Sequence, residues 1–147
     1  MPGDAGPDCI FCAIVAGQAP ASTIPVGPDL TAVMDIRPVT PGHLLVIPNR
    51  HVASLAELAD DERAAMFNAG AGLAERLRSS GLPCEGINLF LADGEAAGQE
   101  VFHVHLHVIP RSAGDGFSVD ADAWRRTPPT RAELDAQARH IGNSPQD

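Results

Sequence analysis

Histidine alternates with apolar residues in the segment that runs from His103 to Arg111 and reads HVHLHVIPR. Strict alternation is the period of a β-strand, so it predicts a strand over 101–109 whose three imidazoles project from one face. The opposite face would anchor the strand to a core through Phe102, Val104, Leu106 and Val108. Pro110 cannot donate to a ladder, and we expect it to end the strand. Because a solvated strand normally carries threonine, lysine or glutamate, the histidine row predicts a functional site.

Two kinds of chemistry fit three imidazoles on one strand face. The histidines can hold a metal ion through neutral ring nitrogens. Alternatively, one histidine can act as a nucleophile while its neighbours position or neutralise a substrate. The segment Gly98-Gln99-Glu100 lies just upstream, where a glycine-containing turn can bring backbone N–H groups close to an anion. This arrangement favours a phosphate site beside the histidines over a purely metallic one.

Hydrophobic periodicity and turn residues predict a chain of mixed α and β structure. Strands are expected over 22–26, 30–36, 43–47, 86–91 and 101–109. A short helix is expected over 9–16, and a long one is capped by Asp60 and ends near Gly81. The apolar stripe of the long helix would be formed by Met66, Ala69, Gly70, Leu73 and Leu77.

A last helix is predicted after Pro128-Pro129, where Thr130 and Glu133 form a capping box. Its apolar face would consist of Leu134, Ala138 and Ile141. The order of elements predicts an α+β fold, a five-stranded antiparallel meander sheet with two main helices. We divide the chain into a disordered arm over 1–8, a core over 9–112 and a tail over 113–147 in the same domain. Trp124 in the tail is interpreted as a packing anchor, with a specificity role as the alternative.

The chain is acidic, with 19 acidic and 10 basic residues, a formal net charge of −9, and arginine as every basic residue. It is therefore a poor candidate for nucleic-acid binding, which needs basic patches. No apolar run approaches the length of a transmembrane helix, so we expect no membrane span. Residues 1–8 lack the basic and apolar regions of a secretory signal, and we expect a cytoplasmic protein.

Cys9 and Cys12 form a Cys-x-x-Cys pair near the N-terminus. Such a pair can bind zinc, act as a redox couple or occur by chance. A redox couple would want a thioredoxin-like βαβ setting, which the sequence does not indicate. A closed structural zinc site needs four ligands, so two more would have to come from elsewhere in the chain. Cys84 is interpreted as an ordinary residue at a strand edge.

The ordered set of motifs resembles the histidine triad superfamily, and most of all its small bacterial nucleoside-phosphoramidase-like branch. The resemblance covers residues 9–111. Its motifs are Asp35-Ile36, Pro41-Gly42-His43, the apolar run 44–48, His51, Gly94, Gly98-Gln99 and the His-x-His-x-His segment. It implies a homodimer with twofold symmetry in which the two sheets join, a common form of oligomer in general.

The resemblance also implies a role for each site residue. His105 would be the nucleophile, His107 would contact the phosphate, and His43 would lie beside the nucleophile. Structural zinc would be held by Cys9, Cys12, His51 and His103, and no organic cofactor is implied. Asp35 would bind the ribose hydroxyls of a purine nucleotide, and Ile36, Phe11 and Ile14 would line the base pocket. Further substrate contacts are expected from Asp93, Gly98, Gln99 and Glu100.

The implied reaction is cleavage at the α-phosphate of AMP–amine or related nucleotidyl substrates through a nucleotidyl-histidine intermediate. Three alternatives stay open: a dinucleoside polyphosphate hydrolase or phosphorylase, a nucleotide-binding regulatory protein, and a metallohydrolase with zinc on all three triad histidines. Ala92 departs from the family pattern because it cannot make the amide contact of many relatives. The neighbouring Asp93 would compensate only in part, since its carboxylate would repel phosphate. Glu100 replaces a hydroxyl residue of some relatives. Protonated, it could act as a general acid; ionised, it would favour a cationic amine leaving group.

Overall fold

The computed structural model describes residues 8–119, 121–124 and 127–145 of the chain. The chain divides into two units, residues 1–115 and residues 116–147, and each is described by itself. All but the last residue of the predicted disordered arm lie outside the described residues. The first unit contains the helices α1 (Ile10–Val15) and α2 (Asp60–Arg78), the strands β1 (Thr23–Pro25), β2 (Leu30–Met34), β3 (Leu44–Pro48), β4 (Gly86–Phe90) and β5 (Leu106–Arg111), and the 3₁₀ turns η1 (Leu55–Glu57) and η2 (Glu95–Ala97).

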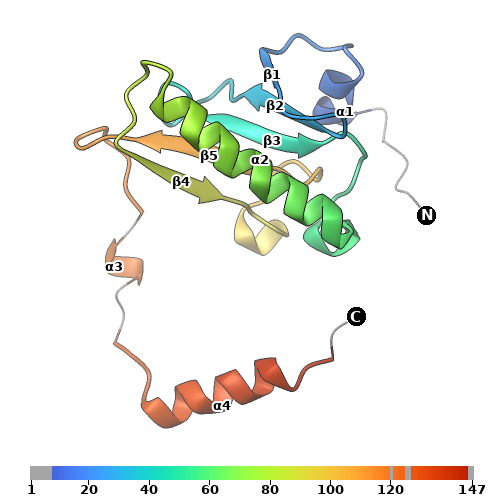
Figure 1. The fold of residues 1–147 in the computed structure, drawn as a ribbon. Helices are drawn as coiled ribbons and strands as arrows, with labels where there is room; N and C mark the ends of the chain where they lie inside the picture. The colour runs from blue at the N-terminus through green and yellow to red at the C-terminus, as the bar shows by residue number, and fades with distance from the viewer. Residues whose placement is uncertain (1–7, 120, 125–126, 146–147) are drawn as a thin grey trace. The chain divides into compact units, whose positions relative to one another are not determined.

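The five strands form one antiparallel sheet in the order β1-β2-β3-β5-β4 (Figure 1). The predicted α+β class and the five antiparallel strands are confirmed. The predicted meander is correct only through β3, because β5 lies between β3 and β4. The connection from β3 to β4 contains the long helix α2, which crosses the sheet and allows β4 to pair at the far side of β5.

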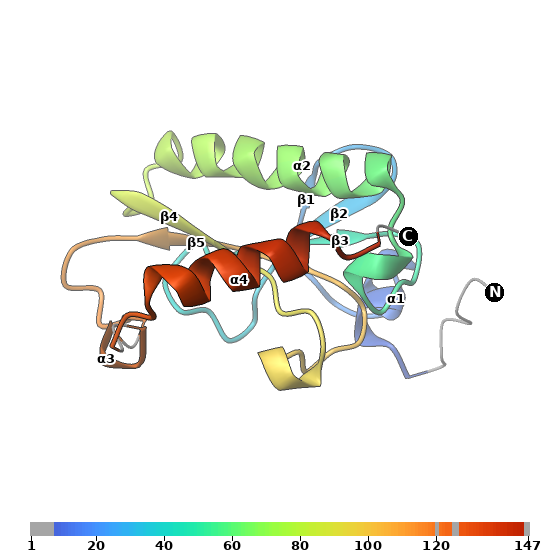
Figure 2. The same cartoon turned by 90° about the horizontal axis from the view of Figure 1, so that it is seen from below.

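Strand β3 is buried on both faces, which explains its uninterrupted apolar sequence. Leu44 and Val46 pack in the core cluster that contains the buried face of α2, whereas Leu45 and Ile47 pack with Phe11 of α1. Figure 2 shows α2 on one face of the sheet and α1 on the other. In β5, Leu106 and Val108 lie on the α2 side. His107 therefore points to the α1 side, as the alternation predicts.

Helix α2 approaches the sheet closely because one of its buried positions is glycine. Its buried residues are Met66, Gly70, Leu73, Ala74 and Leu77, close to the predicted stripe. A Cβ atom on Gly70 would lie 2.8 Å from Leu106 Cδ2, which is too near for an ordinary contact. The predicted cap is wrong by one residue. Ala59 is the N-cap, its N–H donates to the Glu62 carboxylate at 3.0 Å, and Asp60 is the first helical residue.

The predicted strand over 101–109 is wrong at both ends. Strand β5 begins at Leu106, since the Val104 N–H donates to Val52 O at 2.8 Å instead of entering the ladder. Phe102, which was expected to anchor the strand, is 51% exposed. Pro110 lies inside β5, beyond Val108, the last β5 residue that pairs with β3, so it does not end the strand. The first two triad histidines thus lie in an irregular segment before the strand.

The second unit contains α3 (Ala121–Trp124) and α4 (Arg131–Gly142). The predicted capping box is confirmed, because the Glu133 N–H donates to Thr130 Oγ1 at 3.2 Å and the Thr130 N–H donates to Glu133 Oε2 at 2.7 Å. The predicted apolar face of α4 is not buried: Ile141, for example, is 77% exposed. Trp124 is 79% exposed, and the packing role expected for it stays a prediction. None of the helices in the described parts of the chain combines the length and the apolar character that crossing a membrane requires.

Candidate functional site

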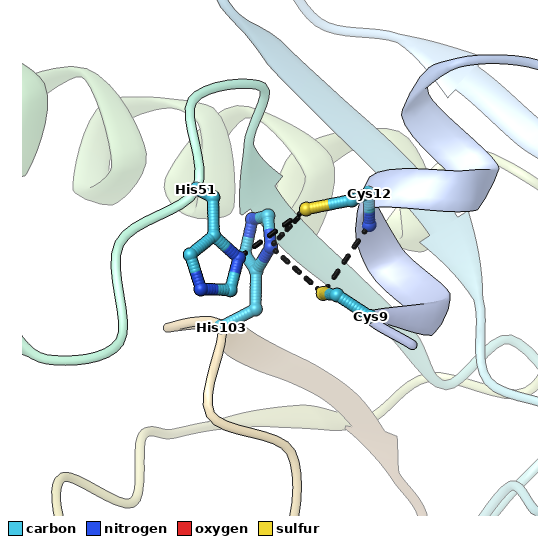
Figure 3. Close-up of side chains that lie close together, drawn as sticks. All are labelled: Cys9, Cys12, His51 and His103. Atoms are coloured by element: carbon cyan, nitrogen blue, oxygen red, sulfur yellow. Dashed lines mark hydrogen bonds between the residues drawn. The ribbon is translucent and has the colours of Figure 1, made fainter. Parts of the chain in front are cut away.

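The four predicted metal ligands converge from three segments of the chain (Figure 3). Cys9 and Cys12 lie at the start of α1, His51 follows β3, and His103 precedes β5. Their ligand atoms all lie within 4.8 Å of one another. Cys12 Sγ is 3.2 Å from His51 Nδ1 and 3.6 Å from His103 Nδ1, and Cys9 Sγ is 3.5 Å from His103 Nδ1. We call these four residues the metal cluster.

The hydrogen bonds of His103 leave one ring nitrogen free for the metal cluster. The imidazole is fully buried, and its Nε2–H donates to Pro48 O at 2.8 Å. The lone pair is then on Nδ1, which faces the two sulfurs. Burial lowers the pKa of His103, which keeps the ring in the neutral form that a metal ligand requires. Metal-bound histidines commonly hold their second nitrogen in this way.

The cysteine pair is arranged to receive a cation. Cys9 is the N-cap of α1, and its sulfur accepts a hydrogen bond from the Cys12 N–H at 3.4 Å. Burial raises the pKa of Cys12 to about 11, and the adjacent Cys9 adds to the increase. The Cys12 thiol therefore keeps its proton near neutral pH until a cation replaces it. Sulfur and nitrogen ligands of a tetrahedral zinc ion lie about 3.5 Å apart, so the separations in the metal cluster fit zinc.

A pocket of about 410 Å³ opens between α1, the end of β2 and the segment before β5. Eight of the predicted catalytic and substrate-binding residues line it: Phe11, Ile14, Asp35, Ile36, Gly98, Glu100, His105 and His107. Most of its wall is apolar, and a few polar groups converge in it, which is typical of small-molecule sites. Ile36 is 91% exposed, so an apolar side chain stands open to a ligand at the rim.

His105 presents a free ring nitrogen to this pocket. Its Nδ1–H donates to the main-chain carbonyl of His103 at 2.8 Å, so the lone pair is on Nε2. The imidazole is 9% exposed and packs edge-on against Phe11, with 5.1 Å between the ring centroids. A neutral imidazole held in a single tautomer is a competent nucleophile.

Two further histidines form a directed chain of hydrogen bonds beside the pocket. The Val39 N–H donates to His43 Nδ1 at 3.0 Å, so the proton of His43 is on Nε2. His43 Nε2–H donates to His107 Nδ1 at 2.9 Å, which places the proton of His107 on its own Nε2. His107 therefore offers an N–H donor to the pocket. His43 contacts His107, whose ring centroid lies 5.1 Å from that of His105; the place beside His105 that the resemblance implied for His43 stays a prediction.

Burial keeps both of these rings neutral near pH 7. It lowers the pKa of His107 to about 4, and the neighbouring His105 and His43 add to the decrease. Burial also lowers the pKa of His43, against the opposing effect of Asp35. Asp35 Oδ2 lies 3.4 Å from His43 Nε2, and Asp35 Oδ1 accepts from the Arg37 N–H at 2.8 Å. The carboxylate is therefore held in place in the pocket wall.

Asp35, His43 and His107 are also close enough together to hold a metal ion by distance alone. The hydrogen bonds argue against that role. A cation on His43 Nε2 would require the proton to move to Nδ1, where it would face the Val39 N–H. We therefore interpret these residues as a hydrogen-bond relay.

Gln99 and Asp93 hold the loops around the pocket rather than line it. The Gln99 side chain is buried, accepts from the Gly94 N–H at 2.8 Å and donates to Ala53 O at 2.7 Å. Asp93 Oδ1 accepts from the Leu55 N–H at 3.0 Å. Ala92, by contrast, does line the pocket. A substrate contact from Gln99 or Asp93 stays a prediction.

Sequence reasoning missed Arg37 and Phe90, which also line the pocket. The Arg37 guanidinium lies 3.8 Å from the Glu100 carboxylate, and the two side chains are 86% and 83% exposed. Phe90 packs near the His107 ring, with 5.6 Å between centroids. Arg37 could have been found, because it directly follows the Asp35-Ile36 motif. Phe90 depends on the register that pairs it with His107 across β4 and β5.

Comparison with known proteins gives matches over most of the chain. A model of the HIT domain matches residues 16–114. An uncharacterized HIT-like protein of Mycobacterium tuberculosis is 42% identical over 123 residues, which are 84% of this chain and 85% of the relative. Adenylylsulfatase HINT3 of Arabidopsis thaliana is 33% identical over 109 residues, which are 74% of this chain and 54% of the relative.

A solved structure gives a match of similar strength. The crystal structure of a Zn-bound histidine triad family protein from Mycobacterium smegmatis is 41% identical and has a TM-score of 0.73. The match covers 88% of this chain and 97% of that one.

Proposed function

The chain belongs to the HIT domain family, and on that premise we propose that it is a nucleotide hydrolase or transferase that cleaves AMP–amine or related nucleotidyl substrates at the α-phosphate. The observation that carries the proposal is the tautomer of His105, whose Nδ1–H bond to the His103 carbonyl leaves Nε2 as a nucleophile in the pocket. The Arabidopsis relative is named for an activity on adenylyl sulfate, which supports an adenylyl substrate here.

The reaction would proceed by two displacements at phosphorus. His105 Nε2 attacks the α-phosphorus, and the bond from phosphorus to the amine breaks. The bonding electron pair passes to the amine nitrogen, which takes up a proton from solvent water as it leaves. Water then attacks the phosphorus of the nucleotidyl-histidine, the bond from phosphorus to His105 Nε2 breaks, and the attacking water gives up a proton to solvent, so that AMP is released and His105 Nε2 recovers its lone pair. Dividing one displacement into two lowers the individual barriers.

The remaining pocket residues would bind and orient the substrate. His107 Nε2–H donates to a phosphate oxygen and stabilises the charge that builds up there. His43 positions His107, because its own hydrogen bond fixes which nitrogen of that ring carries the proton. Asp35 accepts hydrogen bonds from the ribose hydroxyls. The purine base would lie against Phe11, Ile14 and Ile36, which line the pocket.

Zinc is proposed as a structural ion on the metal cluster. The ligand separations, the His103 tautomer and the match to a Zn-bound relative support it. When bound, a closed site of four protein ligands stabilises the fold and leaves no open position for a substrate. His105 and His107 are then left free for chemistry, which argues against a metallohydrolase that uses all three triad histidines.

Arg37 and Glu100 bear on the leaving group, because they carry opposite charges at the rim of the pocket. Glu100 would favour a cationic amine, whereas Arg37 would favour an anionic group such as the second nucleotide of a dinucleoside polyphosphate. Ala92 is the observation that favours a regulatory nucleotide-binding role instead, since its methyl side chain offers no hydrogen bond to a substrate in the pocket.

The protein would act as a homodimer joined at strand β4. This strand lies at an edge of the sheet and pairs only with β5 among the described strands. The edge strand itself carries exposed apolar side chains, since Leu89 and Phe90 are 38% and 54% exposed. An unpaired, apolar edge is a template for pairing with another strand.

Intact-protein mass spectrometry after rapid mixing with an AMP phosphoramidate tests the proposed chemistry. An added AMP mass is expected on wild type and on the control His140→Ala, whose exposed histidine lies in α4, but not on His105→Ala. AMP release should also be lost in His105→Ala alone. If wild type binds AMP yet gives neither an adduct nor AMP release, the regulatory alternative replaces the enzyme.

A further inference from the structure

His103 connects the metal cluster directly to the proposed nucleophile. Its side chain belongs to the cluster, where Nδ1 lies 3.5 Å from Cys9 Sγ and 3.6 Å from Cys12 Sγ. Its main-chain carbonyl accepts the hydrogen bond that fixes the tautomer of His105. A metal ion bound to the His103 ring would therefore also restrain the main-chain carbonyl oxygen of His103, which accepts the hydrogen bond that orients His105.

Helix α1 makes a second connection. Phe11 lies between the two cysteines in the sequence, and its ring contacts the rings of both His103 and His105, with centroids 5.8 Å and 5.1 Å away. Phe11 and Ile14 also form part of the pocket wall. The helix has six residues, of which only Phe11 is buried, so it has little stability of its own. A cation shared by the two cysteines and the two histidines would hold this part of the wall in place.

From these contacts we propose that metal binding at the cluster and nucleotide binding in the pocket are energetically coupled, through α1 and through the main chain of His103. The metal would increase the affinity for nucleotide because it fixes both the wall formed by α1 and the orientation of His105. Linkage requires the reverse effect to be equally large, so nucleotide must increase the affinity for the metal by the same factor. This inference rests on the proposed function, because it assumes that the pocket binds a nucleotide.

The experiment measures both sides of this cycle with AMP and Zn²⁺ as the probes. Calorimetry gives the Kd of AMP for the zinc-loaded protein and for the protein stripped by a chelator. Competition with a chromophoric chelator gives the Kd of Zn²⁺ with and without saturating AMP. We expect the two ratios to agree, and each to lie between about 5-fold and 150-fold, the usual range of coupling between sites.

Two variants test the route of the coupling. Phe11→Leu keeps an apolar wall but removes the ring that contacts His103 and His105, so the coupling factor should fall below that of wild type, while the His103 main chain still carries the remainder. Cys84→Ser is the matched control, because this cysteine lies outside the metal cluster and the pocket, and it should keep the wild-type factor.

Each of the other outcomes is decisive. If zinc-loaded protein does not bind AMP, the proposed function fails, and the coupling fails with it. Equal Kd values of AMP with and without zinc overturn the coupling and leave the proposed function standing. A failure to bind Zn²⁺ also overturns the coupling, together with the proposed structural zinc, but leaves the proposed cleavage at the α-phosphate standing. Loss of the far-ultraviolet circular dichroism of the sheet on zinc removal overturns the proposal, since the effect would then be global unfolding. A wild-type factor in Phe11→Leu overturns the part of the proposal that assigns coupling to α1, and leaves the His103 main chain as its only route.

Discussion

The neutral, partly buried state of His107 predicts that the folded protein loses stability as the pH falls. In the unfolded chain this histidine binds a proton near its ordinary pKa of 6.5, whereas in the folded protein its pKa is about 4. Between these two pH values the unfolded state binds more protons, so acid favours unfolding. At about 1.4 kcal/mol per pH unit, the effect amounts to about 3 kcal/mol, all of it lost between pH 6.5 and about pH 4.

Urea unfolding of wild type and His107→Asn, from pH 7 down to pH 4, measures this effect. The asparagine oxygen can accept the hydrogen bond from His43 Nε2 but does not titrate. Both proteins keep the same cysteines and the other histidines, so the difference between their stability curves isolates His107. Between pH 7 and pH 4, wild type should lose about 3 kcal/mol more of its free energy of unfolding than His107→Asn does. The control His140→Asn should lose as much as wild type. Parallel curves for wild type and His107→Asn would refute the account of a neutral His107.

Two other predictions concern the rim of the pocket and the edge of the sheet. Arg37→Gln should shift the ratio of kcat/KM values toward cationic amine leaving groups over dinucleoside polyphosphates, and Glu100→Gln should shift it the other way, each by about 2- to 5-fold because the charges are exposed; unchanged ratios in both would exclude these residues as selectors. Leu89→Arg should convert a dimer into a monomer in light scattering at micromolar concentration, whereas Leu134→Arg on α4 should not, and a monomeric wild type would contradict the dimer.

Local sequence patterns were sufficient for the elements whose contacts are periodic. The alternation in 103–111 correctly places Leu106 and Val108 opposite His107, because every second residue of a strand faces the same way. The apolar run of β3 and the stripe of α2 follow from the same reasoning. The start of β5 could not be predicted, since it depends on the Val104 N–H bond to Val52 O, a contact between distant segments that leaves no mark in the local pattern.

The site was predictable as a set of residues but not as a set of hydrogen bonds. The Cys-x-x-Cys pair indicates half of a metal site, and only the family resemblance supplied the other two ligands, one of which is 94 residues away from Cys9. The pairing of His43 with His107 depends on how the segment before β3 meets β5. The role of Gln99 depends on the loop around Gly94, whose φ of 94° favours glycine. These features arise from tertiary packing, which no single sequence window contains.

The relay that ends at His107 begins at a main-chain amide, and this origin gives it a fixed polarity. A side-chain donor at the same place could rotate, titrate or be replaced, and the protons of both imidazoles could then move to the opposite nitrogens. The Val39 N–H belongs to the main chain, so it neither rotates freely nor titrates. Among the natural residues, only a substitution by proline would remove it. Each neutral imidazole accepts a hydrogen bond on Nδ1 and donates one from Nε2, so the direction of donation is the same at both rings. The backbone of the loop between β2 and β3 thereby dictates that the pocket receives a donor from His107 and never an acceptor while both rings stay neutral.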